Sequence, residues 1–202
     1  MLGLVMSPTL VRDPVAMLDQ ARRECDRRGD LWVFGYASLI WRPEFEFVEH
    51  HPARVHGWHR SFWMRSRVNR GTPAQPGLVF ALVSGGSCRG MVFRIERARV
   101  QEELTRLWAR EMPTGVYDPR WLPCRTARGP VTALGFTLSR RSPNFTGRLP
   151  DVDLLQVLRQ ASGRYGTTLD YLLHTAHALR ERGMLDRELA RLVALAREAG
   201  LT

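Results

Sequence analysis

VFGYASLIW, residues 33–41, is the stretch of this sequence that says most about the fold. An apolar run passes through small residues and then becomes apolar again, which predicts a buried strand followed by a tight turn. Gly35, Ala37 and Ser38 put little bulk over the main chain, so the amides of this turn are open to a carboxylate or carbonyl oxygen. The turn is therefore a candidate ligand-binding loop, and an ordinary strand-to-helix turn is the alternative.

The charge of the chain invites a nucleic-acid interpretation, but its distribution argues against one. The 30 basic residues outnumber the 20 acidic ones, the formal net charge is +10, and every basic residue is arginine. A complete absence of lysine is typical of a compositional bias of the source genome. The arginines also alternate with acidic residues on predicted helices, as on solvated surfaces. We predict no nucleic-acid partner; an arginine-rich, non-catalytic module that binds RNA or another anion is the alternative.

Length and cysteine content indicate one domain in a reducing compartment. With 202 residues, 44% of them hydrophobic, the chain can bury a continuous core. Cys25, Cys88 and Cys124 are odd in number and form no CxxC pair, which argues against a disulfide framework. The apolar segment Met1–Met6 is too short for a signal peptide, and no apolar run is long enough for a membrane span. We expect a cytoplasmic protein with no membrane partner.

Short apolar runs separated by glycine- and proline-bearing turns predict six strands. They are Leu31–Tyr36, Ala53–Trp58 (continuing through Met64), Leu78–Val83, Cys88–Ile95, Trp121–Thr126 and Val131–Leu138. A helix over Arg99–Glu111 interrupts them, with Val100, Leu104, Leu107 and Trp108 on one face. This order indicates a barrel-like sheet.

Helices are predicted on either side of the strands. Asp13 followed by Pro14 begins one that ends at Gly29. Three more are predicted over 151–161, 167–182 and 186–199, each with a capping residue at its start and a glycine at its end. We expect a single domain over 1–202: an N-terminal helix in 1–30, the barrel with one inserted helix in 31–142, and C-terminal helices in 143–202.

Glu111 is the first candidate for a catalytic residue. It ends the predicted helix 99–111, and Met112-Pro113 break that helix. The helix dipole disfavours a carboxylate at this end, and apolar neighbours add to the effect, so the pKa of Glu111 should be raised. A raised carboxyl pKa suits proton transfer near neutral pH. The alternative is a surface glutamate that merely ends a helix.

Further motifs follow residues 33–41 in a recognisable order. They are the loop Arg70–Gly77, the segment Trp108–Met112 with its Arg110-Glu111 pair, Gly115-Val116-Tyr117, Tyr165-Gly166 and Tyr171-Leu172-Leu173. Over about residues 31–190, their order and spacing resemble the ChaC-type γ-glutamylcyclotransferases, the kind that degrades glutathione. In that family the signature Val-Phe-Gly-Tyr-Gly-Ser-Leu-Ile-Trp is followed much later by Arg-Glu.

The resemblance implies a fold, a reaction and a catalytic residue. The fold is the γ-glutamylcyclotransferase-like α+β fold, a small mixed β-barrel flanked by α-helices. In the implied reaction, the α-amine of the glutamyl group of glutathione attacks its own γ-carbonyl and releases 5-oxoproline and Cys-Gly. This ring closure requires positioning, proton transfer and oxyanion stabilisation, but no cofactor. The resemblance makes Glu111 the catalytic acid/base.

Main-chain groups are the expected substrate ligands. We hypothesise that the amides of Tyr36, Ala37, Ser38 and Leu39 hold the α-carboxylate and carbonyl oxygens of the substrate. Ala37 stands where the family usually has glycine, which costs about 1 kcal/mol if the backbone requires a positive φ. Phe136 stands near a position where some relatives have tyrosine. Tyr117 or Tyr165 would have to replace any contact of that hydroxyl.

Arg70, Tyr117 and Tyr165 complete the candidate substrate-binding residues. The guanidinium fork of Arg70 suits a carboxylate, and a solvated arginine in a basic loop is the alternative. The tyrosines have the alternative of packing as half-buried rim residues. The six histidines show no HExxH pattern and no spacing with cysteine, so we expect no metal site. Other γ-glutamyl amino acids or γ-glutamylamines are alternative substrates, and the sequence leaves the oligomeric state open.

Overall fold

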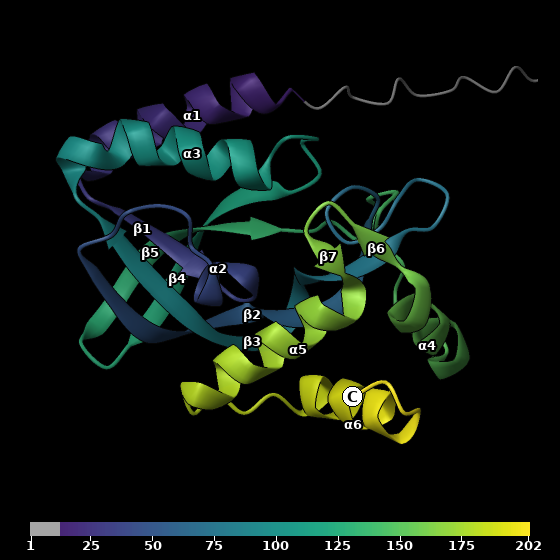
Figure 1. Ribbon diagram of the computed structural model, residues 1–202. Coiled ribbons are helices and arrows are strands. Elements are labelled where there is room, and N and C mark those ends of the chain that lie inside the picture. The colour runs from purple at the N-terminus through teal and green to yellow at the C-terminus, as the bar shows by residue number, and fades with distance from the viewer. Residues whose placement is uncertain (1–12) are drawn as a thin grey trace, which may run out of the picture.

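The protein is described by a computed structural model over residues 13–202, and Met1–Met6 lies outside the described residues. Five strands form a closed barrel in the order β1-β3-β2-β4-β5 (Figure 1). They are β1 (Leu31–Gly35), β2 (Glu49–Ser66), β3 (Gly77–Ile95), β4 (Asp118–Thr126) and β5 (Gly129–Thr137). Most neighbours are antiparallel, whereas β5 meets β1 and β3 in parallel. The predicted small mixed barrel flanked by helices is therefore confirmed.

The prediction of six short barrel strands is wrong in one respect. The predicted strands Leu78–Val83 and Cys88–Ile95 are two parts of the single strand β3. Their continuity comes from β2, which pairs with β3 from Glu49↔Arg94 to Ser66↔Gly77. A register shift between His56 and Trp58 takes up the glycine-rich stretch that looks like a turn in the sequence.

Helices cover the barrel from two sides. Helices α1 (Pro14–Arg28) and α3 (Val100–Glu111) lie side by side, and a 3-10 turn (Arg97–Arg99) leads into α3 (Figure 1). A second group packs together elsewhere on the barrel, made of α4 (Asp151–Gln160), α5 (Thr168–Glu181) and α6 (Arg187–Glu198). The predicted apolar face of α3 is buried. Within residues 13–202, no helix combines the length and apolar character that crossing a membrane requires.

The end of β1 leads directly into a helical turn, as in the strand-to-helix turn that the sequence offered as an alternative. Helix α2 (Ser38–Trp41) begins three residues after Gly35, and its Trp41 indole donates to Thr175 Oγ1 of α5 at 3.3 Å. A Cβ placed on Gly35 would lie 3.0 Å from the Cβ of Leu39. This tight reversal places the loop 36–39 between the barrel and α5.

A small hairpin between α4 and α5 was also missed. It pairs β6 (Ser162–Gly163) with β7 (Gly166–Thr167). Gly163 was predicted to end the preceding helix, which instead ends at Gln160. The physical reason for Gly163 is close approach, because a Cβ there would lie 2.5 Å from the backbone N of Gly71. The hairpin thus rests on the β2–β3 loop, where Tyr165 N donates to Asn69 O at 2.9 Å.

Gly90→Ala should destabilise the barrel where the loop 36–39 begins. A Cβ on Gly90 would lie 2.3 Å from Gly35 O and 2.9 Å from the Phe34 ring. Overpacking of this kind costs about 1–3 kcal/mol, which urea denaturation would measure. Ser87→Ala, an exposed change on the same strand, is the control and should leave the midpoint nearly unchanged. Equal midpoints for both variants would contradict the tight packing at Gly90.

Candidate active site

Two adjoining cavities open between the barrel and α5. The inner one is lined by Tyr36, Ala37, Ser38, Leu39, Phe80, Glu111, Tyr117, Phe136 and Tyr171. The outer one is a cleft of about 480 Å³ whose lining includes Arg70 and Tyr165. Four residues line both: Ser38, Glu111, Tyr117 and Tyr171. The structure thus brings all eight candidate residues from the sequence to one connected space, which has the volume of a small-molecule site.

Glu111 stands where the inner cavity meets the outer cleft. It is the last residue of α3, and 14% of its side chain is exposed. Burial raises the pKa of its carboxyl above the ordinary value, while the guanidinium of Arg110, with Nε 3.0 Å from Oε1, opposes that shift. The predicted direction is confirmed, and desolvation is its main cause. A carboxyl group in this setting is suited to accept and return a proton.

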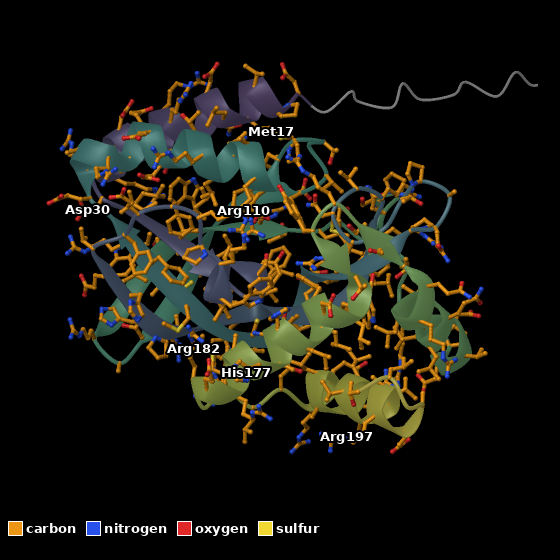
Figure 2. All side chains as sticks on the ribbon, viewed as in Figure 1. Met17, Asp30, Arg110, His177, Arg182 and Arg197 are labelled. Carbon is orange, nitrogen blue, oxygen red and sulfur yellow. The ribbon has the colours of Figure 1, made fainter. Side chains whose placement is uncertain are left out.

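Arg110 connects Glu111 to the chain around α2. Arg110 lies below α3 in the middle of the view in Figure 2. Its guanidinium donates to Ser38 Oγ at 3.1 Å and to Pro43 O at 2.9 Å, and lies 3.3 Å from Glu44 Oε2. Glu44 adopts a positive φ of 57°, which is uncommon for a residue with a side chain. One arginine therefore holds the carboxylate of Glu111 in register with the loop 36–39.

Three buried tyrosines surround Glu111. Tyr36 and Tyr117 hydrogen-bond to one another, and Phe80 N donates to the Tyr171 hydroxyl at 3.2 Å. Burial raises the pKa of all three phenols above the ordinary value. They are therefore neutral at physiological pH. One hydroxyl proton is used within the Tyr36–Tyr117 pair, so one proton of that pair and the proton of Tyr171 remain as possible donors.

The loop 36–39 leads into the first turn of α2. Ala37 has a φ of −145°, so the cost that a left-handed backbone would impose on alanine does not arise. Ile40 N donates to Ala37 O at 2.9 Å and Arg42 N donates to Ser38 O at 2.8 Å. The amides of residues 37–39 precede these first bonded groups of the turn, and such amides have no partner within a helical turn.

Arg70 and Tyr165 belong to the outer cleft. Arg70 is 7% exposed, and its Nη1 donates to Tyr165 O at 2.6 Å. Its guanidinium also lies 5.2 Å from the ring centroid of Tyr171. Tyr165 is 44% exposed, with the guanidinium groups of Arg42 and Arg164 at 5.1 and 5.3 Å from its ring. The cleft therefore has a cationic, aromatic mouth.

Phe136 packs in the wall of the inner cavity. It is 1% exposed and contacts the rings of Trp108 and Tyr117, with centroids 5.8 and 6.2 Å away. Tyr117 shares this cavity with Phe136, whereas Tyr165 lines only the outer cleft. Of the two tyrosines considered as replacements for a hydroxyl here, only Tyr117 has the position to act.

Sequence reasoning missed two residues of this site. Tyr171 and Arg110 both lie in motifs that signalled the family, but neither was assigned a role. The sequence around Tyr171 does not indicate that it lies in the site, because only the folded chain brings α5 against α2. Among residues 13–202, no group of three or more histidine, cysteine, aspartate or glutamate side chains is arranged to hold a metal ion.

Comparison with known proteins shows which family this chain belongs to. A family model described as ChaC-like protein matches residues 31–199. The chain belongs to the ChaC-like family. The resemblance predicted from the sequence is thereby confirmed.

Relatives in the ChaC-like family extend over most of this chain. A glutathione-specific γ-glutamylcyclotransferase of Escherichia coli is 38% identical over 78% of this chain and 69% of its own length. Glutathione-specific γ-glutamylcyclotransferase 1 of Rattus norvegicus is 32% identical over 72% of this chain and 68% of its own.

Comparison with solved structures shows the same fold. A crystal structure of a γ-glutamyl cyclotransferase specific to glutathione from yeast matches with a TM-score of 0.76 at 22% identity. It covers 84% of this chain and 96% of the yeast chain. The predicted γ-glutamylcyclotransferase-like fold is confirmed.

Glu111→Gln should stabilise the protein near neutral pH. Because the folded-state pKa is raised, the ionised carboxyl disfavours the fold once the pH rises through that value. The neutral amide avoids this cost, so the melting temperature should rise above that of the wild type. Melting curves at several pH values would show the gain shrinking below about pH 4, where both side chains are uncharged. A gain independent of pH would contradict the desolvation of Glu111.

Proposed function

We propose that this protein is a γ-glutamylcyclotransferase that cleaves glutathione into 5-oxoproline and Cys-Gly. The observation that carries this proposal is the half-buried carboxyl group of Glu111, with a raised pKa, beside the amides of a tight loop and three neutral tyrosines. The E. coli relative bears the name of this activity and is 38% identical. The degradation is expected in a reducing cytoplasm, in keeping with three free, buried cysteines.

Binding of the γ-glutamyl group is the first requirement of the reaction. The α-carboxylate and the γ-carbonyl oxygen are both hydrogen-bond acceptors, and the amides of residues 37–39 are donors that come from the backbone. Fixing both oxygens would fold the glutamyl chain so that its nitrogen approaches its own carbonyl carbon. The tyrosine hydroxyls add neutral donors where the oxyanion develops.

Proton transfer is the second requirement, and Glu111 performs it twice. The carboxylate first removes a proton from the α-ammonium group, and the free amine attacks the γ-carbonyl carbon. When the tetrahedral intermediate collapses, the C–N bond to cysteine breaks. The Glu111 carboxyl then returns the proton to the departing amine, and the ring nitrogen loses its second proton to solvent, which leaves 5-oxoproline and Cys-Gly. Arg110 holds the carboxylate toward the loop in both steps.

The outer cleft is assigned to the Cys-Gly part of the substrate. Its volume of about 480 Å³ lies within the range of small-ligand sites. Arg70, Arg42 and Arg164 lie along it, and a peptide that ends in a carboxylate matches their charge. One guanidinium nitrogen of Arg70 is hydrogen-bonded to the β6–β7 hairpin. In this proposal, Arg70 both shapes the cleft and binds the carboxylate of the substrate. γ-Glutamylamines should be poorer substrates, because their departing groups lack this carboxylate.

Glu111→Gln should lower kcat by about 100-fold or more, because the amide keeps the shape of the side chain but does not accept a proton. In the wild type, kcat/KM should fall as the pH drops through the raised pKa of Glu111, since the base must be ionised. Release of 5-oxoproline from glutathione, γ-Glu-Ala and γ-glutamyl-lysine measures both effects. Near-wild-type kcat in the variant would exclude Glu111 as the base.

N-acetylglutathione separates cyclisation from hydrolysis in the same assay. Its acylated nitrogen is not nucleophilic, so no ring forms and no Cys-Gly should appear. Release of Cys-Gly together with N-acetylglutamate would replace cyclotransfer with hydrolysis. Failure of all three γ-glutamyl compounds to yield 5-oxoproline would overturn the proposed function itself.

Ala37→Val should raise KM about 10-fold or more, because Ala37 is 5% exposed and a larger side chain would block access to the loop amides. Ser38→Ala keeps the amide and loses only the hydroxyl that accepts from Arg110, so its KM should change less. Steady-state kinetics with glutathione compare the two. A larger KM effect at Ser38 than at Ala37 would favour side-chain over backbone recognition.

A further inference from the structure

Arg60 is a buried arginine that holds the loop 36–39 from the protein interior. It lies on β2, and only 2% of its side chain is exposed. Its Nε donates to Tyr36 O at 2.5 Å and its Nη2 to Arg89 O at 2.6 Å, while Nη1 pairs with Asp186 Oδ2 at 2.5 Å. A cation this deeply buried is tolerated only when its donors are satisfied. Arg60 lines neither cavity, so it makes no contact with a ligand there.

The bond to Tyr36 fixes the direction of one peptide group. No cis peptide bond occurs among residues 13–202, so the carbonyl of Tyr36 and the amide of Ala37 point in opposite directions. Because Arg60 draws the carbonyl inward, the Ala37 N–H is turned away from Arg60. Tyr36 and Ala37 both line the inner cavity, so this amide is one of the donors proposed to bind substrate.

Asp186 extends this arrangement to the C-terminal helix. It is the N-cap of α6, and its Oδ1 accepts from Leu189 N at 3.0 Å while Oδ2 pairs with Arg60. One carboxylate therefore both begins α6 and holds the guanidinium that orients the loop. Tyr36 and Asp186 are 150 positions apart in the sequence, and Arg60 joins them.

We infer that Arg60, held by Asp186, is a positioning residue for substrate binding: it aims the Ala37 amide at the carboxylate or carbonyl oxygen of the γ-glutamyl group. This inference rests on the proposed function for the identity of the ligand. A core ion pair that only stabilises the fold is the competing interpretation. The two differ in whether KM responds separately from kcat and from the melting temperature.

Asp186→Ser and Arg60→Gln are the informative variants. Serine remains a good helix N-cap but is too short to reach Arg60, so α6 stays capped while the guanidinium loses its carboxylate. Asp186→Ser should raise KM for glutathione about 3- to 10-fold, and Arg60→Gln more than 10-fold. In both, the pH at which kcat/KM falls should stay unchanged, because Glu111 sets it.

Asp13→Ser is the matched control. Asp13 is the N-cap of α1 and accepts from Val15 N at 2.9 Å, but it has no part in the site. It should leave KM unchanged. Melting temperatures of all variants separate loss of stability from loss of binding.

Amide hydrogen exchange of residues 34–42, followed by mass spectrometry without substrate, tests the inference independently of activity. Exchange there should be faster in Asp186→Ser and Arg60→Gln than in wild type and Asp13→Ser. If the wild type makes no 5-oxoproline, the proposed function fails and exchange alone decides the role of Arg60. Wild-type KM and wild-type exchange in Asp186→Ser would overturn the inference, whether or not Arg60→Gln folds.

Discussion

The long antiparallel pairing of β2 with β3 is the constraint on which the rest of the structure depends. It runs from Glu49↔Arg94 to Ser66↔Gly77, and each end of β3 serves a different purpose. The C-terminal part pairs with β1 and so fixes where the loop 36–39 begins. The N-terminal part supplies Phe80, whose amide holds Tyr171 beside Glu111. The loop that joins β2 to β3 carries Arg70.

The charged side chains of the protein include two contrasting groups: ion pairs at the surface and the buried carboxyl group of Glu111. Many arginines are engaged in ion pairs, as Arg94 is with Asp30 and Glu49. Such pairs at the surface contribute little to stability, and much of the positive charge of the chain is neutralised locally by neighbouring carboxylates. Glu111 differs because burial opposes its ionisation and one neighbouring arginine compensates only in part. A site that performs proton transfer retains this cost, since a fully compensated carboxylate would be a weak base.

Local signals predicted most elements of the fold. Asp13, Thr167 and Asp186 cap helices as their residue types indicate, and the apolar spacing of α3 marked its buried face. Prediction was wrong where a long-range partner overrides a local signal. The glycines near residue 85 predicted a turn, yet β3 continues through them because it pairs with β2 on both sides. Gly163 was predicted to end a helix, whereas glycine is required there because the backbone of Gly71 in the β2–β3 loop approaches closely.

The sequence alone determined the family and the α+β barrel and named Glu111 and the loop 36–39 as candidates, because each rests on residues close together in the chain or on motifs in a fixed order. Tertiary structure decided what surrounds them. Desolvation of Glu111, the tyrosine cluster and the contact of Arg60 with Tyr36 and Asp186 depend on segments that meet only after the barrel closes and α5 and α6 pack against it. Burial and hydrogen-bond direction are properties of distance in space, which linear spacing does not specify.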